Sequence, residues 1–401
     1  MRDGWEAVKL AQCLASLDVR AGRNGPDLVL SVTEKRGIIP QSSVFKNRIA
    51  TADTSKYKVL EKYDIAYNPY LLWCGAIGQW KGESAGVVSP VYECFRVNGN
   101  HDPSFFGLLF ESGALTPYFN STAIGSIERR RRTTPHVFMN AMLSVPPLVE
   151  QRRIVGVIQS VDNYIAALQE GVDAARIARN AVLHELLNAG GDGWVETALG
   201  EVARIGGGKR LPKGTPWSST TTRHRYIRAT DIHDGHVDEA QLVYVPDEVW
   251  PTIQRFTVQT SDVIITIAGT IGQLAIIEEN LNGVNLTENA AFIRCVSESC
   301  IPDYILLLLS SYYGQSQIRA LTVGTTQMKL GLERIASIKV VAPPLVEQQR
   351  IVEIVSSMDD SIRATEQTIV EAKNLRSGLL SDLLSGEHEI PESYDKLLGA
   401  A

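Results

Sequence analysis

Two long stretches of the chain place apolar residues on one face of a helix. In each stretch, apolar side chains recur in steps of four and three residues, the a/d pattern of a helix packed along one partner helix. The positions are Ile154, Ile158, Val161, Ile165, Leu168, Val172 and Ala175 in the first stretch, and Ile351, Val355, Met358, Ile362, Thr365, Ile369 and Ala372 in the second. We therefore expect two long helices, over about residues 148–188 and 345–385, that bury these stripes against each other in an antiparallel pair.

The two stripes belong to a longer internal repeat. "PPLVEQRRIV" begins at Pro146, and "PPLVEQQRIV" begins at Pro343, 197 residues later. Proline suits the first turn of a helix and cannot sit inside one, so each motif predicts a helix start. Gly190 and Gly386 predict the corresponding helix ends. The segments that precede the motifs match more weakly, as in "GAIGQ" and "GTIGQ", and predict a globule before each helix.

Both globules read as mixtures of short strands and helices. Runs such as "SDVIITIAG" and "KYDIAYNP" are strand-like and broken by Gly, Pro and Asn. The predicted fold class is α+β, with two globular α/β domains separated by two long antiparallel helices that form a coiled coil, related by a pseudo-two-fold internal repeat. The predicted boundaries are residues 1–145 and 191–342 for the globules, 146–190 and 343–386 for the helices, and 387–401 for a C-terminal tail.

Composition restricts the class of protein. The chain has 401 residues, of which 44% are hydrophobic and 21% charged, which indicates a soluble protein of two or more domains. The apolar run "YILLLLS" is too short to cross a membrane, and "MRDGWEAVKL" lacks the apolar core of a signal peptide. The five cysteines show no CxxC pair and no nearby histidine, which argues against a metal site and predicts a reduced cytoplasm.

The net charge of −6 is unevenly distributed. Residues 1–145 contain 17 Lys/Arg and 13 Asp/Glu, a net of +4, whereas residues 343–401 contain 5 and 11, a net of −6. Because the field near one surface decides what that surface attracts, an acidic total does not exclude a nucleic-acid partner.

Two divergent globules, each followed by a "PPLxEQxxI" helix, resemble the specificity (S) subunit of a type I restriction–modification system. The resemblance covers essentially the whole chain. It implies two target recognition domains on conserved spacer helices, in a cytoplasmic and non-catalytic subunit that binds an interrupted double-stranded DNA target. It also implies two methyltransferase subunits as partners, which would hold S-adenosylmethionine and methylate adenine at N6, while this chain binds no cofactor. Whether two restriction subunits join them stays open.

The second globule contains the most informative charge pattern. From Val202 to Thr230 there is no acidic residue, and the core of the stretch reads "GGGKRLPKG". Glycines allow a backbone to approach a phosphate closely, cations neutralise it, and Arg can also bond guanine. We favour a DNA-binding surface over a merely solvated loop. The candidate contacts are Lys209, Arg210, Lys213, Arg223, Arg225 and Arg228, with Arg204 and His224 in the same stretch.

The first globule and the polar loops before each Pro-Pro motif add further DNA candidates. Loops at that position resemble the polar loop of the specificity-subunit family, although a solvated tip would look the same. The candidates are Lys35, Arg36, Lys46, Arg48, Asn68, Arg129, Arg130, Arg131 and Arg132 in the first globule, and Thr325, Thr326 and Gln327 in the second.

The first turns of the two helices supply candidate partner contacts. They are Glu150, Gln151 and Arg153 in the first copy and Glu347, Gln348 and Arg350 in the second. Glutamate in a first turn also favours the helix dipole, so helix-start capping explains these residues equally well.

No pattern of catalytic residues emerges. "YNPY" at Tyr67 superficially resembles the (N/D)PP(Y/F) motif of amino-methyltransferases, but the second proline is missing, so a turn is favoured. Asp231, Asp234 and Asp238 fail the calcium-loop spacing and predict a polar hairpin. Two rival functions remain: a coiled-coil spacer between protein-binding globules, and a free-standing DNA-modifying enzyme, against which the missing cofactor loop argues.

Overall fold

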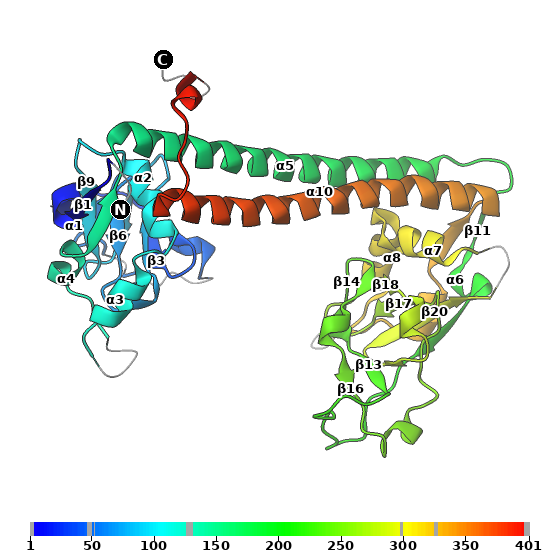
Figure 1. Cartoon of the computed structure of the whole chain (residues 1–401). Coiled ribbons are helices and arrows are strands. Elements are labelled where there is room, and N and C mark those ends of the chain that lie inside the picture. The colour runs from blue at the N-terminus through cyan, green and yellow to red at the C-terminus, as the bar shows by residue number, and fades with distance from the viewer. Residues whose placement is uncertain are drawn as a thin grey trace. The chain divides into compact units, whose positions relative to one another are not determined.

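The computed structural model of the chain describes residues 4–45, 50–51, 53–125, 131–296, 300–324 and 328–396. The chain forms two compact units, Met1–Gln169 with Gln367–Ala401, and Glu170–Glu366. Both passages between the units lie inside the long helices α5 (Leu148–Asn188) and α10 (Leu345–Ser385). Each unit therefore contains one globule and half of each helix (Figure 1).

The first unit is built on a four-stranded antiparallel sheet of order β2-β9-β6-β7. Strands β1 and β10 pair beside it, as do β3 with β4 and β5 with β8. Its strands are β1 (Glu6–Lys9), β2 (Leu14–Leu17), β3 (Leu30–Thr33), β4 (Gly37–Pro40), β5 (Lys58–Leu60), β6 (Ile65–Tyr67), β7 (Ile77–Gln79), β8 (Gly86–Val88), β9 (Glu93–Val97) and β10 (Met142–Val145). Its shorter helices are α1 (Leu10–Cys13), α2 (Pro103–Glu111), α3 (Thr116–Thr122) and α4 (Pro135–Met139).

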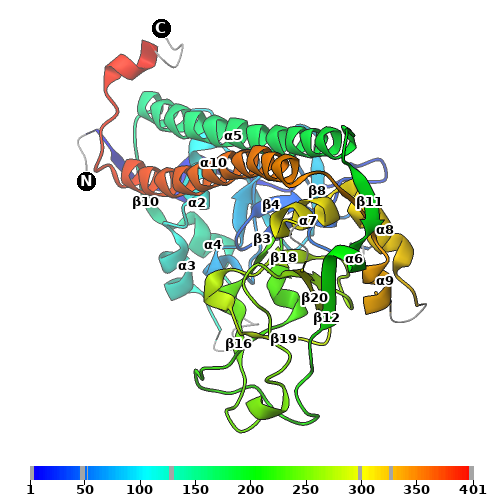
Figure 2. The ribbon, with the colours of Figure 1, turned by 90° about the vertical axis from the view of Figure 1, so that its right-hand side faces the viewer.

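The second unit repeats this plan. Its four-stranded antiparallel sheet has the order β12-β20-β17-β18, and β11 pairs with β21 as β1 pairs with β10. The strands are β11 (Val195–Ala198), β12 (Ala203–Gly207), β17 (Val263–Thr266), β18 (Leu274–Ile276), β20 (Ala290–Cys295) and β21 (Lys339–Ala342), and the helices are α6 (Leu199–Val202), α7 (Pro302–Ser310), α8 (Tyr312–Leu321) and α9 (Leu332–Ala336). Helix α7 lies between the sheet and the long helices (Figures 1 and 2).

A smaller lobe is inserted between β12 and β17. It contains β13 (Arg225–Ile227), β14 (Ile232–His233), β15 (His236–Val237) and β16 (Val243–Tyr244), with β19 (Asn285–Leu286) returning to pair with β13. β14 and β15 form the hairpin expected around Asp234, which adopts a positive φ of 52°. The segment read as a turn at Asn68 is also one, because the backbone N–H of Tyr70 donates to Asn68 Oδ1 at 3.1 Å.

Side chains along a central strand point alternately to the two faces of the sheet, and both faces are covered, which explains why these strands are mostly apolar. Val263 and Ile265 belong to the core beneath α7, whereas Ile264 belongs to a second core on the opposite face with Ala275 and Ile277. Successive side chains of a strand point to opposite faces, so a strand covered on both sides needs an unbroken apolar run. In "VIIT" the three apolar residues follow this rule, and all four residues are buried, the Thr266 hydroxyl donating to the Thr270 oxygen.

The long helices pair antiparallel, as predicted. In the first unit, Ile154 from the start of α5 shares a core with Leu380 from the end of α10, and in the second unit Leu183 shares one with Ile351. Each of the fourteen predicted stripe positions is buried or half-buried. Burying an Ile or Leu side chain is worth roughly 1.5–3 kcal/mol, so the seam is a major source of stability.

Repeated ion pairs set the register of the helices. In the second unit Arg179 Nη2 lies 2.9 Å from Asp359 Oδ2, and in the first unit Arg376 Nη2 lies 3.0 Å from Asp162 Oδ2. Both arginines and both aspartates are 197 residues apart, so one interaction occurs twice. The internal repeat expected from the sequence is thus present in topology, seam and ion pairs.

Candidate nucleic-acid interface

The cation-rich segment of the second unit leaves β12 and crosses the inserted lobe. Two hydrogen bonds fix its first residue: the Tyr226 hydroxyl donates to the Lys209 carbonyl oxygen at 2.9 Å, and Lys209 N–H donates to the Leu286 oxygen at 2.9 Å. A Cβ at Gly208 would overlap the carbonyl oxygens of Leu286 and Thr287. Gly208 is therefore required for packing inside the protein, which explains this glycine without a phosphate.

The segment is not free of counter-charges once folded. Three of its arginines meet carboxylates that lie outside the segment, at N–O distances between 2.5 and 3.0 Å. The pairs are Arg210 with Glu288, Arg225 with Glu239, and Arg228 with Asp231. A paired guanidinium has less positive charge to offer a phosphate, so these three arginines are weaker candidates than the sequence suggested.

Lys209, Lys213 and Arg223 differ from those arginines. All three are exposed, and none makes an ion pair with any residue that the structure describes. Exposed aromatic surface accompanies them: Trp217 is 40% exposed, and the Lys209 ammonium lies 5.8 Å from the ring centre of Phe256. Unpaired cations interleaved with aromatic rings are typical of nucleic-acid surfaces, where cations meet phosphates and rings stack on bases.

In the first unit, two of the candidate cations, Arg131 and Arg132, lie at a hairpin, beside aromatic rings. Residues Ile124 and Arg132 pair across the base of a hairpin loop. The Arg131 guanidinium lies 4.8 Å from the ring centre of Trp73, and that of Arg132 lies 5.7 Å from the ring centre of Tyr70. Tyr70 is 42% exposed, so this surface also combines arginine with open aromatic area.

The same loop position recurs in the second unit. There Val323 pairs with Lys329 as Ile124 pairs with Arg132. The next residue anchors the loop in both units: Thr133 N–H donates to the Pro69 oxygen at 2.9 Å, and Leu330 N–H donates to the Ile267 oxygen at 3.0 Å. Arg132 and Lys329 thus occupy equivalent places. Lys329 was missed in the sequence, although its distance of 197 residues from Arg132 marks it.

The remaining DNA candidates are scattered or not described. Lys35 and Arg36 are exposed in the turn between β3 and β4, and Asn68 accepts a hydrogen bond in its own turn. Seven candidates lie outside the described residues, namely Lys46, Arg48, Arg129, Arg130, Thr325, Thr326 and Gln327.

The glutamines of the repeated motif are structural residues. The Gln151 amide accepts from Asp102 N–H at 2.8 Å and donates to the Pro146 oxygen at 2.9 Å, and Gln348 does the same with Ile301 N–H and the Pro343 oxygen at 3.0 and 2.8 Å. Both side chains are 1% exposed. This corrects their assignment as partner contacts, because a buried amide cannot face a partner.

The charged residues of the motif differ between its copies. Glu150 accepts from the Trp5 indole at 3.1 Å, and Arg153 forms a bidentate ion pair with Asp395 at 2.6 and 2.7 Å. Glu347 and Arg350 pair only loosely with each other, at 3.2 Å, and the Arg350 side chain is 63% exposed.

A second repeated ion pair escaped the sequence interpretation. Arg96 Nε lies 2.7 Å from Asp64 Oδ1, and Arg294 Nε lies 2.7 Å from Asp262 Oδ1. The aspartate of each pair is 1% exposed. The pairs tie two adjacent strands of each central sheet together and raise the pKa of both arginines. Their common offset of 198 residues was the available signal.

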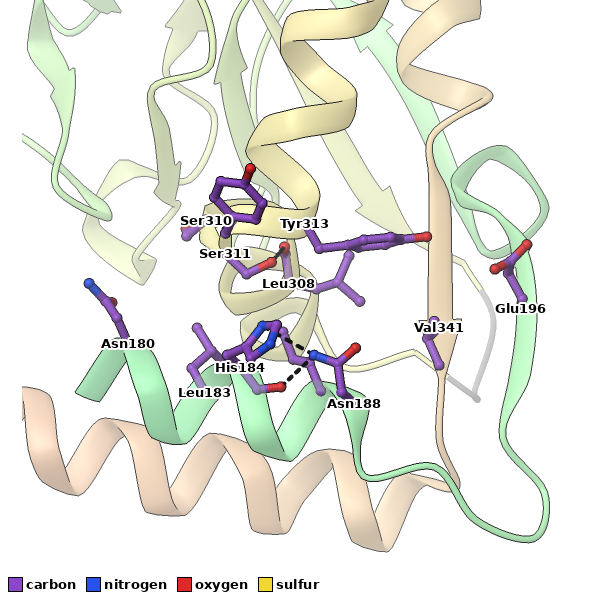
Figure 3. Close-up of a pocket in the computed structure, with 12 residues that line it drawn as sticks. Asn180, Leu183, His184, Asn188, Glu196, Leu308, Ser310, Ser311, Tyr313 and Val341 are labelled. Atoms are coloured by element: carbon purple, nitrogen blue, oxygen red, sulfur yellow. Dashed lines mark hydrogen bonds between the residues drawn. The ribbon is translucent and has the colours of Figure 1, made fainter. Parts of the chain in front are cut away.

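A cavity of about 370 Å³ lies between α5 and the junction of α7 with α8 (Figure 3). The cavity wall contains the apolar side chains of Leu183, Leu187 and Leu308. His184 and Ser310 add polar groups to the same wall. In the first unit, Arg376 Nη1 and Glu111 Oε1 are 2.7 Å apart at the place where α10 meets α2. Ser310 stands at the position of Glu111 in the repeat, so it cannot form the corresponding ion pair.

The described part of the chain shows neither a metal-binding cluster nor a membrane span. No group of three or more His, Cys, Asp or Glu among these residues is arranged to hold a metal ion. No helix in the described ranges is long and apolar enough to cross a bilayer.

Comparison with known proteins finds a matching family model and similar proteins. A family model described as "Type I restriction modification DNA specificity domain" matches residues 191–374. The chain is 20% identical to the type I restriction enzyme MjaVIII specificity subunit of Methanocaldococcus jannaschii, over 96% of this chain and 93% of that protein. It is 24% identical to the EcoBI specificity subunit of Escherichia coli, over 64% of this chain and 60% of that protein.

Two solved structures share the fold. The first is described under "Structural basis underlying complex assembly and conformational transition of the type I R-M system". Its TM-score is 0.64 at 17% identity, and the match covers 96% of this chain and 98% of that one. The second is the HsdS subunit from Thermoanaerobacter tengcongensis, with a TM-score of 0.50, 19% identity, and 97% and 98% covered. These likenesses confirm the predicted fold class.

Proposed function

We propose that the chain is a specificity subunit of a type I restriction–modification system, a non-catalytic DNA-recognition component, and that each of its units binds one half of an interrupted duplex target. One observation supports this best. The two units share their topology, and the equivalent hairpin loop brings a cation, Arg132 or Lys329, to the equivalent place. The surroundings differ between the units, so their half-sites differ in sequence.

In the second unit, Lys209, Lys213 and Arg223 contact phosphates. Their exposure and lack of carboxylate partners within the described ranges support this role. Phosphate contacts set the position of the protein on the duplex, while base edges supply sequence information. In the first unit, Arg131 and Arg132 contact phosphates in the same way, from their positions beside the aromatic rings of Trp73 and Tyr70.

The proposal includes partners that carry the chemistry. Two methyltransferase subunits bind the long helices, hold S-adenosylmethionine and methylate adenine at N6 after flipping it from the duplex. This chain binds no cofactor, and two restriction subunits complete the assembly where the system also cleaves DNA. The repeated helix starts support two like partners, and a genomic target implies action in the cytoplasm.

Salt dependence tests the phosphate contacts. In the assembled complex, Lys209→Ala, Lys213→Ala and Arg223→Ala should each flatten the slope of log K against log salt by about 0.9. Arg210→Ala is the matched control and should change the slope less, because Glu288 already pairs with that guanidinium. Equal slopes for the three variants and the wild type would refute the assignment. A complex without any salt-dependent DNA affinity would favour the rival interpretation, a spacer between protein-binding globules.

A further inference from the structure

The C-terminal tail occupies the start of α5 in the first unit. After Gly386 ends α10, the tail brings Ile390 into the core that contains Ile154 and Leu383, and Ile390 is only 7% exposed. The short helix η8 (Glu392–Lys396) then presents Asp395 to Arg153 in the bidentate ion pair. An apolar anchor and a carboxylate thus hold the tail in place.

This tail has no counterpart in the other half of the chain. α5 is followed after five residues by Trp194, the counterpart of Trp5, so no segment of comparable length follows it. The equivalent of Arg153 is Arg350, whose side chain is 63% exposed and whose ion-pair partner in the described ranges is Glu347 of its own helix. Leu186, the equivalent of the buried Leu383, is only half-buried.

Apolar surface surrounds the exposed arginine. Val346 is 83% exposed and Leu345 is 43% exposed, both within the first turn of α10. The equivalent Val149 in the first unit is less exposed, at 54%. The start of α10 therefore has an exposed guanidinium in the same stretch as exposed apolar side chains.

We propose that the start of α10, around Arg350, is a docking site for a segment of the methyltransferase subunit in which a carboxylate stands beside an apolar side chain, and that the tail covers the equivalent site at Arg153. This rests on the proposed function. A guanidinium prefers a carboxylate that it can bind with two parallel hydrogen bonds, and Asp395 shows that geometry at Arg153. The tail acts as an internal substitute for the partner at one of two like sites.

One consequence is that the two methyltransferase subunits bind unequally. The first binds at Arg350 without displacing anything, whereas the second must remove the tail from Arg153. Freeing Arg153 should therefore strengthen the second binding step alone.

Titration of the methyltransferase subunit into the full chain, followed by calorimetry and native mass spectrometry, tests the proposal. Arg350→Ala should weaken one binding step about tenfold or more, a loss of about 1.4 kcal/mol. Arg363→Ala is the control, because Arg363 is an equally exposed arginine of α10, at 67%. Asp395→Asn, and a chain that stops after Gly386, should strengthen the other step, and adding Arg153→Ala should remove that gain. Thermal unfolding of each variant verifies that it is folded.

The outcomes separate this proposal from the function on which it rests. Binding that is unchanged by Arg350→Ala would overturn the site while leaving the proposed function intact. If the chain instead associated with a second copy of itself through Arg350, the proposed occupant would be wrong, and this would also overturn the proposal. If the wild type bound no methyltransferase, the function would fail. In that case the tail peptide 386–396, added at about 1 mM, would probe the site at Arg350. If the peptide did not bind the chain, or bound the Arg350→Ala variant equally well, the site would be refuted.

Discussion

Two buried hydroxyls beneath the hairpin loop of the first unit lack hydrogen-bond partners among the described residues. They are Tyr67 Oη and Thr133 Oγ1, and both side chains are fully buried. In the second unit Ile265 and Leu330 occupy the equivalent places, and both are apolar. An unsatisfied buried polar atom costs about 1–3 kcal/mol, so the first unit tolerates polar atoms where the second has a purely apolar core.

Removing these hydroxyls should therefore not destabilise the protein. We expect Tyr67→Phe and Thr133→Val to leave the unfolding temperature unchanged or to raise it. Tyr304→Phe is the contrasting variant, because its hydroxyl donates to the Val341 oxygen at 2.7 Å and its loss should cost about 1 kcal/mol. Thermal unfolding of the full chain measures all three. A clear fall for Thr133→Val would show that its hydroxyl has a partner after all.

Cysteine chemistry illustrates what sequence spacing does not show. Cys295 and Cys300 follow no known motif, yet the sulfur atoms of Cys295 at the end of β20 and of Cys300 before α7 lie 2.7 Å apart. A hydrogen bond from the Cys300 thiol lowers the pKa of Cys295, whereas burial raises the pKa of Cys13 to about 11 and that of Cys94 to about 12. The fold therefore separates one reactive thiol from inert ones that look alike in the sequence.

Alkylation should reveal this difference. At about pH 8, iodoacetamide should label Cys295 first, since only the thiolate attacks and the pKa of Cys295 is the one that is lowered. Diamide should take two electrons and two protons from Cys295 and Cys300 and leave a disulfide between them. Peptide mass spectrometry reports both products. Labelling of Cys13 or Cys94 before Cys295 would contradict the assignment.

At the scale of elements, the repeated Asp–Arg pairs contribute to each central sheet. Asp262 is 1% exposed and accepts from the Arg294 guanidinium and from Gln259 N–H at 2.7 Å. Arg294→Ala would leave a buried carboxylate without its cation, which should destabilise the protein by about 3 kcal/mol or more. Arg363→Ala removes an exposed pair with Asp360 and should cost under about 1 kcal/mol. Equal unfolding temperatures for the two variants would contradict this.

The helix seam was predictable from the sequence, since its stripe depends only on spacing within one helix. The cross-helix ion pairs were not, because Asp162 and Asp359 lie outside the stripe and meet their arginines only once the register is set. Ile362 is 8% exposed, so Ile362→Asp places an unpaired charge in the seam and should lower stability by about 2 kcal/mol or more. Ile177→Asp is the matched control, because Ile177 is 72% exposed and should tolerate the change in a thermal unfolding assay.

At the scale of the whole molecule, the repeat in the sequence predicted the architecture, but the sequence did not show which cations of the candidate DNA surface stay unpaired. Two copies of one motif with two stripes predict globules that alternate with helices. Which cations stay unpaired depends instead on acids such as Glu239 and Glu288, which the fold brings to Arg225 and Arg210 from outside the cation-rich segment. Charge along the sequence therefore overestimated the number of cations that stay unpaired in this segment.

Exchange of one globule tests the division of labour. Replacing residues 191–342 with the second globule of another specificity subunit should change one half of the methylated sequence, because each unit has its own sheet, cores and candidate surface. Methylome sequencing of a host that also carries the methyltransferase subunit reads the result. Changes in both half-sites would refute independent reading, and methylation by the purified chain alone would refute a non-catalytic subunit.

Lengthening the helices tests whether they set the spacing between the half-sites. Four residues make about one turn, so inserting four after Gln169 and four after Glu366 adds about 6 Å to each helix and nearly preserves its buried face. Both insertions lie where the chain passes between its units, so the ion pairs Arg179–Asp359 and Arg376–Asp162 keep their partners. Since bases of one strand are 3.4 Å apart along the duplex axis, the unread spacer of the methylated sequence should grow by about two base pairs while both half-sites stay the same. An insertion in α5 alone is the control, and it should disrupt the seam because the two stripes then lose their register. An unchanged spacer in a folded, active double insertion would show that the helices do not act as the ruler.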